Sequence, residues 1–316
     1  MRKTSIQRYA GLFLVLSALS GAACKSGQTS ANAPSTSLKK FVFAPRVGLT
    51  FQHEMKNLDE IAVTGSSFRD SVESRVLWEV KVKEDSSGKY NYVRRLVEFG
   101  LKVNGAELLK GKEVEPRRAE IVQVMSKDGH VIDVSGTAQI TEALAALVAD
   151  PTAKARIKEM FSPENIRELL RARAVDAFDE VVGKPADVGS SWSAKENYGP
   201  LKGKMVFVDS ALGCGGRSCV KLKRAFDVDQ QKVGEAVRQR MAGFLKESGA
   251  DPAAVKLVDS NLKVEDTFVV EQDTCHFHDS SLVQEGQFVF EGPQKNRVAV
   301  TLTSKQTSHA EYPPPN

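Results

Sequence analysis

The chain has 316 residues, of which 41% are hydrophobic and 27% are charged. This composition supports one or two folded domains with a sizeable core, and it excludes a disordered chain and a bundle of membrane helices. The formal charge is +4, but Arg2, Lys3 and Arg8 fall in a predicted leader, which leaves +4 − 3 = +1. A nearly neutral mature chain without a basic, aromatic-rich stripe predicts no nucleic-acid partner.

The first 24 residues have the order of an export signal. Basic residues precede the apolar run 11–16, and the small residues 20–23 lead directly into Cys24. The run is shorter than the ~20 residues that cross a bilayer, so we predict a cleaved signal peptide over residues 1–23. The small residues before Cys24 resemble the lipobox of bacterial lipoproteins, although Gly21 departs from that pattern. The resemblance implies lipidation of Cys24; a cut after Ala23 without lipidation is the alternative.

Residues 24–38 predict a flexible tether behind the lipidated cysteine. They are mostly Ser, Thr, Gly, Ala, Asn, Gln and Pro, which bury too little surface to fold. Together with Cys24, the tether predicts a body held at the cell envelope through an N-terminal lipid anchor in the membrane. Lys25 takes the place of the acidic residue that retains lipoproteins at the inner membrane. We therefore expect the outer membrane, with the protein facing the periplasm or the cell surface.

Residues 39–136 form an N-terminal β part with a period near two. The runs 75–83 and 90–103 are extended, and Ser87-Gly88 between them is a hairpin signal. A second hairpin is predicted from 119–125 and 131–134 around Asp128-Gly129, a pair that supplies the positive backbone angles of tight turns. We predict five or six antiparallel strands here.

Residues 137–184 predict a helical segment. Asp150-Pro151 and Ser162-Pro163 each place a capping residue before a first-turn proline. Apolar residues recur at helical spacing before and after these signals, at Ile140, Leu144, Leu147 and Val148, and then from Ile166 through Ala177 and Phe178 to Val181. We interpret the charged face of the last helix as solvated ion pairs.

Residues 185–312 form a C-terminal β-rich part with one helix, followed by a tail over 313–316. Alternation returns from Trp192, and a helical stripe runs from Val233 to Leu245. Grouped strands, helices and strands predict an α+β fold built on antiparallel sheet. The similar rhythm of the two β-rich parts suggests two related halves.

Four cysteines raise the question of pairing. If Cys24 carries lipid, Cys214, Cys219 and Cys275 remain, an odd number in an oxidising compartment. Cys214 and Cys219 lie close together in a glycine-rich loop, so we predict a disulfide between them. A zinc site formed by this pair, Cys275 and a histidine is the alternative, which export makes less favourable.

The strongest chemical cluster is Cys275-His276-Phe277-His278. In a strand, His276 and His278 share one face and are a plausible pair of metal ligands, with Asp273 or Asp279 near enough to help. The alternative is that Cys275 and Phe277 are core residues and both histidines face solvent.

No sequence motif predicts catalysis. The chain lacks a nucleophile elbow, a zinc-protease helix, a Walker loop and a dinucleotide fingerprint. The spacing of the remaining histidines and of the carboxylates near the start of the chain predicts neither a shared face nor a catalytic role. These residues are His53, His130, His309, Asp59, Glu60, Asp70 and Glu73. We therefore predict that the protein is not an enzyme and has no cofactor.

The segment 119–136 reads as a strand, a turn with Gly129, a valine-rich strand and Gly136. It resembles uncharacterised bacterial lipoproteins similar to lipid carriers of the LolA and LppX type. The resemblance implies a curved antiparallel sheet with helices across its concave face, around an apolar cavity for acyl chains. It carries over no catalytic residue.

Taken together, these features predict a non-enzymatic, membrane-anchored envelope lipoprotein that binds a lipid or other hydrophobic ligand between sheet and helices. One alternative is a structural or protein-interaction module of the envelope, with an envelope protein as its partner. A second alternative is a metal-binding protein that uses His276 and His278.

Overall fold

The computed structural model describes residues 39–113, 119–174, 181–194, 197–198, 200–247 and 251–313. The predicted signal peptide, Cys24 and the tether lie outside the described residues, as do residues 314–316 of the tail. Within the described part of the chain, no helix is long and apolar enough to cross a membrane.

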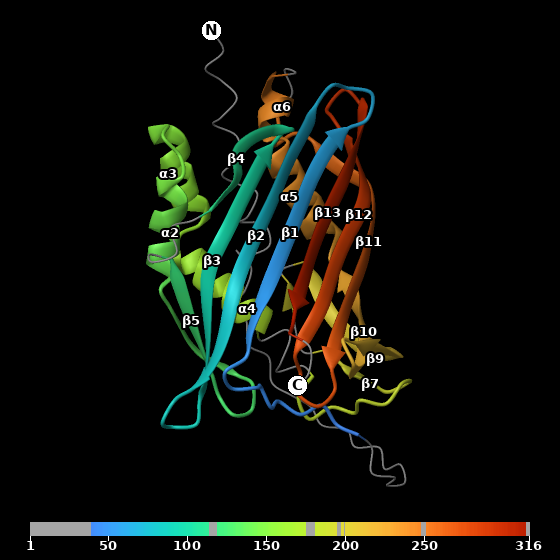
Figure 1. The fold of residues 1–316 in the computed structure, drawn as a ribbon. Coiled ribbons are helices and arrows are strands. Elements are labelled where there is room, and N and C mark those ends of the chain that lie inside the picture. The colour runs from blue at the N-terminus through green and yellow to red at the C-terminus, as the bar shows by residue number, and fades with distance from the viewer. Residues whose placement is uncertain are drawn as a thin grey trace.

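The described strands form one 13-stranded antiparallel sheet, shown in Figure 1. Its main path runs β6-β5-β3-β2-β1-β13-β12-β11-β10-β9-β7, with β4 paired to β3 and β8 paired to β9. The strands are β1 (Thr50–Val63), β2 (Arg69–Glu84), β3 (Tyr90–Val103), β4 (Ala106–Glu113), β5 (Glu120–Met125), β6 (Val131–Ser135), β7 (Ser191–Ser193), β8 (Asn197–Tyr198), β9 (Leu201–Cys214), β10 (Arg217–Val228), β11 (Lys256–Glu271), β12 (Phe277–Glu291) and β13 (Arg297–Glu311).

The predicted α+β fold class is wrong, because the sheet dominates the molecule. The two predicted β-rich parts join in one sheet, because β1 pairs with β13 from Gln52↔Glu311 to Val63↔Val300. Alternation in a sequence shows that a segment is extended, but it does not show which distant segment completes its ladder. Sequence-based prediction therefore missed that both parts form one sheet.

Both predicted hairpins are confirmed. β2 and β3 meet at Glu84↔Tyr90, and the Asp85 carboxylate accepts hydrogen bonds from the backbone N–H groups of Ser87 and Lys89 at 2.8 and 3.0 Å. β5 and β6 pair on either side of Gly129, whose φ of 84° lies in the left-handed region that glycine adopts without strain.

Five helices occur in the described residues: α2 (Thr137–Ala146), α3 (Pro151–Met160), α4 (Pro163–Ala174), α5 (Gln230–Arg240) and α6 (Ala242–Glu247). The predicted starts at Pro151 and Pro163 are confirmed. The predicted stripe at Ala177 and Phe178 lies outside the described residues. α5 begins after Asp229, whose carboxylate accepts a hydrogen bond from the Lys232 N–H at 3.1 Å.

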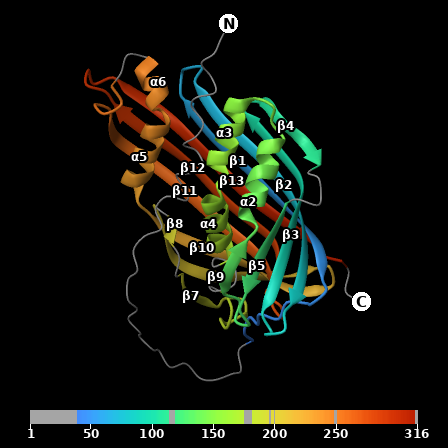
Figure 2. The same cartoon turned by 90° about the vertical axis from the view of Figure 1, so that its left-hand side faces the viewer.

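The helices lie on one face of the curved sheet, as Figure 2 shows. α2 contacts β5, α4 contacts β6, and α5 contacts β11. Two apolar clusters fill the space between the layers. Cluster 1 joins β1–β6 and β9–β11 to α2–α4, with Phe99, Leu96 and Ile140 among its buried members. Cluster 2 joins α5 and α6 to the far ends of β1 and β11–β13, with Val237, Phe288 and Phe290 among its buried members.

A band of inward-facing polar residues, here called the polar row, lies between the two clusters. Asp59 of β1 is opposite Ser304 of β13, which is opposite Gln284 of β12. These positions share the strand face that buries Ile61 and Phe288. The row consists of Asn57, Asp59, Asp70, Ser74, Arg224, Asp266, Gln284, Ser304 and Gln306.

Candidate functional site

The sequence cluster 275–278 is a turn entering a strand rather than a strand throughout. Residues 272–274 turn, Cys275 has a φ of 57°, and β12 begins only at Phe277. Two backbone hydrogen bonds close the turn: Cys275 N–H donates to Glu271 at 3.0 Å, and Glu271 N–H donates to the carbonyl of His276 at 2.9 Å. The predicted strand is therefore wrong for Cys275 and His276. The turn directs both histidines toward the end of β11.

Glu271 is the centre of this cluster. Its carboxylate accepts two hydrogen bonds from Arg46 Nη2, at 3.1 and 2.8 Å, and its Oε2 lies 3.6 Å from Arg217 Nη1. The same Oε2 lies 3.8 Å from His276 Nδ1 and 3.9 Å from His278 Nε2. Although burial opposes ionisation, hydrogen bonds and the nearby arginines lower the pKa of Glu271 to about 2. The carboxylate is thus ionised at neutral pH.

His276 is buried, with only 2% of its surface exposed. Its ring stacks on Tyr312 at 5.2 Å between centroids, and among the described residues neither ring nitrogen has a hydrogen-bond partner. Burial lowers the pKa of His276 to about 4, so the imidazole is neutral at physiological pH. The free thiol of Cys275 is also buried, and burial raises its pKa to about 12. Such a thiol is a poor nucleophile.

Tyr312 covers the cluster from the end of β13. Its hydroxyl donates to the carbonyl of Phe277 at 2.9 Å, and its ring packs 4.6 Å from that of Phe51. The Arg217 guanidinium lies 6.0 Å from the Tyr312 ring centroid and donates to the carbonyl of Pro313 at 3.2 Å. Sequence reasoning missed Glu271, Arg46, Arg217 and Tyr312. The only local signal was the acidic Glu271 ending the apolar run 268–270.

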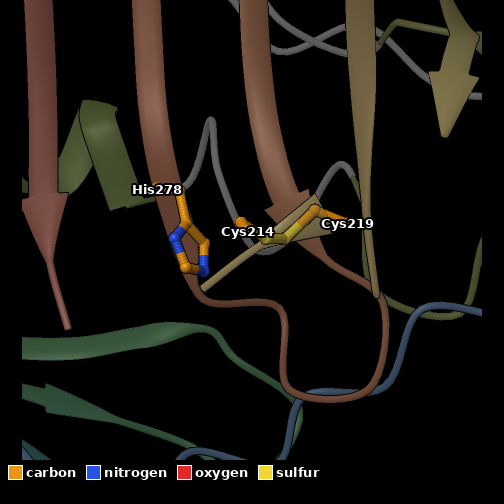
Figure 3. Close-up of side chains that lie close together, drawn as sticks. All are labelled: Cys214, Cys219 and His278. Atoms are coloured by element: carbon orange, nitrogen blue, oxygen red, sulfur yellow. A yellow bond between two sulfur atoms is a disulfide. The ribbon is translucent and has the colours of Figure 1, made fainter. Parts of the chain in front are cut away.

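The predicted disulfide between Cys214 and Cys219 is present, with Cα atoms 6.0 Å apart. Cys214 ends β9 and Cys219 lies in β10, so the bond crosses the hairpin whose turn contains Gly215 and Gly216, both with positive φ. The His278 ring lies beside the bond, as Figure 3 shows. Donor atoms of Cys214, Cys219 and His278 all lie within 4.8 Å of one another.

Among the described residues, this cysteine–histidine triad is the group whose spacing suits a metal ion. His276 and His278 approach the same Glu271 oxygen, but His276 is not in that group. Of the two predicted helper carboxylates, Asp279 instead contacts His309 at 2.7 Å. Metal binding by His276 and His278 stays a prediction.

The other histidines and early carboxylates are dispersed. His53 lies 3.2 Å from Arg94 Nη1 inside the sheet. Glu60 pairs with Arg69 on the surface, and Glu73 lies 3.3 Å from Lys102 Nζ. His130 belongs to the β5–β6 turn, where its N–H donates to Ser126 Oγ at 3.0 Å. Asp59 and Asp70 are brought together in the polar row.

The polar row is only partly satisfied. Asn57 Nδ2 donates to Ser74 Oγ at 3.1 Å, and Arg224 Nη1 lies 3.6 Å from Asp266 Oδ2. Arg240 of α5 reaches across and donates to Asp70 Oδ2 at 2.8 Å. Buried atoms of the row that lack a hydrogen-bond partner among the described residues include Asp70 Oδ1, Gln284 Nε2 and Ser304 Oγ. Burial raises the pKa of Asp59 in the same row.

A cavity of about 370 Å³ lies where α5 meets the beginning of β11. Gly234 lies on the α5 side, while Val255, Leu257 and Phe290 of cluster 2 form its apolar lining. The remaining lining is polar or charged: Gln231, Glu235, Arg238 and Lys256, with Ala253 beside them. A second cavity, of about 260 Å³, is lined largely by polar residues of β1, β12 and β13, including Lys56, Asp279 and His309.

Comparisons with known proteins identify no family. No family model matches the chain, and no curated protein matches it. A structure of lipid–protein interactions in lipovitellin is 8% identical with a TM-score of 0.44; the match covers 86% of this chain and 26% of that chain. This chain thus spans about a quarter of the lipovitellin chain.

Two further structures cover more of their own length but are less alike. DynF, from the dynemicin biosynthesis pathway of Micromonospora chersina, is 9% identical over 90% of this chain and 94% of that chain, with a TM-score of 0.18. A DUF1329 family protein from Desulfovibrio piger is 9% identical over 83% of this chain and 85% of that chain, with a TM-score of 0.14. Similarity at this level assigns no function.

Proposed function

We propose that this protein is a non-enzymatic, membrane-anchored envelope lipoprotein that binds an apolar or lipid-like ligand between the curved sheet and helix α5. The observation that carries the proposal is the cavity of about 370 Å³ beside α5. Its volume falls in the range of about 300–1,000 Å³ found for small-molecule sites. The anchor at Cys24 comes from the sequence and is part of the same proposal.

The cavity has the polarity of a site for an amphiphile. Val255, Leu257 and Phe290 belong to cluster 2, so an apolar chain entering there contacts residues continuous with the core. Arg238, Glu235 and Lys256 lie around the same cavity and are available to a polar head group.

The polar row limits how far such a ligand reaches. An acyl chain that extended from cluster 2 into cluster 1 would lie over Ser304 and Gln284. It has no polar atoms, so it would form no hydrogen bond with their buried side chains. Burying polar groups without partners costs about 1–3 kcal/mol each in protein mutational data. We therefore expect a short or single-chain amphiphile confined to cluster 2, rather than a lipid with several long chains.

The test is native mass spectrometry with lipid extraction on the full chain carrying Cys24→Ser, which removes the acylation site. We expect a stoichiometric lipid-like ligand, or uptake of a single-chain fatty acid added to the protein. Leu257→Gln places a polar group in the cavity lining and should weaken uptake. Val258→Gln, on the next residue of the same strand and 46% exposed, is the matched control.

Protein that stays at its bare chain mass after incubation with fatty acids and envelope lipids would refute ligand binding. Equal uptake by the Leu257 and Val258 variants would place the ligand elsewhere. Melting temperatures of both variants show whether lost uptake comes from lost folding. If no ligand binds, the protein-interaction module becomes the leading explanation.

A further inference from the structure

We propose that Cys214, Cys219 and His278, with Glu271 as the fourth ligand, bind zinc when the disulfide is reduced. The disulfide prevents zinc binding, because it occupies both sulfurs. This inference is independent of ligand binding beside α5. It gives the ends of β9, β10 and β12 that carry these residues a zinc-bound state that forms only after reduction.

The three donor groups are already together. Their ligand atoms lie within 4.8 Å of one another, and they come from three strands: β9, β10 and β12. Zinc–ligand distances of about 2.0–2.3 Å place the donors of a tetrahedral site roughly 3.3–3.8 Å apart. The sulfurs of a disulfide are about 2 Å apart, so reduction lets them separate by the amount that a zinc ion requires.

Glu271 of β11 lies beside the triad rather than within it, and it is the residue that would turn in as the fourth ligand. It is opposite Cys219 in the ladder, and its Oε2 lies 3.9 Å from His278 Nε2. Glu271 is buried, with 8% of its side chain exposed, and its Oε1 can keep the hydrogen bond from Arg46 while Oε2 turns to the metal. His278 Nε2 is a buried atom without a hydrogen-bond partner among the described residues. It is therefore available for a further bond.

Positive charge lies beside the ligands that a zinc ion would need. Two thiolates and one carboxylate carry −3, and Zn²⁺ reduces this to −1. Arg46 and Arg217 each place a positive guanidinium at Glu271, with contacts of 2.8 and 3.6 Å. The cluster therefore offers a compensated environment for a Cys₂HisGlu zinc complex.

The change proceeds in two balanced steps. A thiolate of an external dithiol attacks one sulfur of the disulfide, which expels the other cysteine and forms a mixed disulfide. The second thiol of the reagent then attacks its own sulfur in the mixed disulfide and expels the first cysteine. This releases Cys214 and Cys219 as thiols and leaves the dithiol as its own disulfide, a transfer of two electrons. Zinc then displaces one proton from each thiol. The thiolate ligands block re-oxidation until the metal leaves.

The experiment measures zinc binding by the full Cys24→Ser chain before and after reduction with a phosphine reductant. We expect no stoichiometric zinc in the oxidised protein and one zinc per chain after reduction, read by native mass spectrometry. Cobalt(II) should give a thiolate-to-metal charge-transfer band only after reduction. His278→Ala should lower the zinc affinity at least about tenfold. Even mutation of residues that only hydrogen-bond to a metal ligand lowers metal affinity by about this factor.

Two control variants separate the site from other thiols and histidines. Cys275→Ser removes the remaining thiol, and His309→Ala removes an exposed histidine that pairs with Asp279. Both should bind zinc as the parent does after reduction. Zinc uptake that is equal before and after reduction, absent after reduction, or retained by Cys214→Ser/Cys219→Ser would overturn the proposal. Circular dichroism of the reduced proteins verifies that each remains folded.

Discussion

The contact between Arg240 and Asp70 fastens helix α5 to the sheet. Arg240 Nε donates to Asp70 Oδ2 at 2.8 Å, and its Nη2 donates to the Asp70 carbonyl at 3.2 Å. Only 11% and 10% of the two side chains are exposed. Because α5 also lines the proposed ligand cavity, this ion pair sets both the stability of cluster 2 and the position of the cavity wall.

Arg240→Met keeps most of the side-chain volume and removes the charge. Asp70 then stays buried within the polar row, and its Oδ1 already lacks a hydrogen-bond partner among the described residues. Removing one partner of a buried ion pair costs about 3–5 kcal/mol. About a tenth of each side chain is exposed to solvent. We therefore expect the free energy of unfolding to fall by an amount near the lower end of that range, roughly 3 kcal/mol.

The assay is urea unfolding followed by circular dichroism at pH 7, with Arg238→Met as the matched control. Arg238 lies on the same helix, and its ion pair with Glu235 is more exposed, at 23% and 47%. That control should lose no more than about 1 kcal/mol. Adding Asp70→Asn to Arg240→Met should restore part of the stability, because it removes the orphaned charge. Equal losses for the two arginine variants would refute the reasoning.

Three more predictions follow from individual residues. Because the pKa of His276 falls from 6.5 to about 4 on folding, only the unfolded chain takes up this proton between those values, and lowering the pH from 6.5 to 4 costs about 3 kcal/mol of stability. Urea titrations of His276→Phe should show a flatter dependence of stability on pH. The disulfide Cys214–Cys219 closes a loop with a sequence separation of 5. Chain entropy then predicts that its reduction costs about 2 kcal/mol, measured by thermal melts with and without reductant. Gly136→Ala should cost clearly more than Gly105→Ala in the same melts, because both glycines have positive φ but only a Cβ at 136 meets backbone.

Local signals predicted local structure well. Asp128-Gly129 and Ser87-Gly88 correctly marked two hairpins, and the prolines at 151 and 163 correctly marked two helix starts. Each of these signals acts through backbone angles of a few neighbouring residues. For the same reason, the pairing of Cys214 with Cys219 across a short turn was accessible from the sequence.

Long-range features were not accessible. The fold class failed because nothing in residues 50–63 indicates that their partner is 297–311. The Glu271 cluster collects residues from positions as distant as Arg46 and Tyr312, and periodicity carries no information on such contacts. The polar row has the same cause: Asp59, Ser304 and Gln284 are unremarkable alone and become a band only when three strands are placed in register.

The pairing of β1 with β13 also dictates when the protein can finish folding. β1 is the first and β13 the last of the described strands, so this ladder of the sheet forms only after all the strands between them have been synthesised. Until then β1 and β12 each present an open edge, the kind of surface that pairs with other chains. Ladders between distant segments form slowly. A chain that stops before Arg297 lacks β13 and keeps both edges exposed.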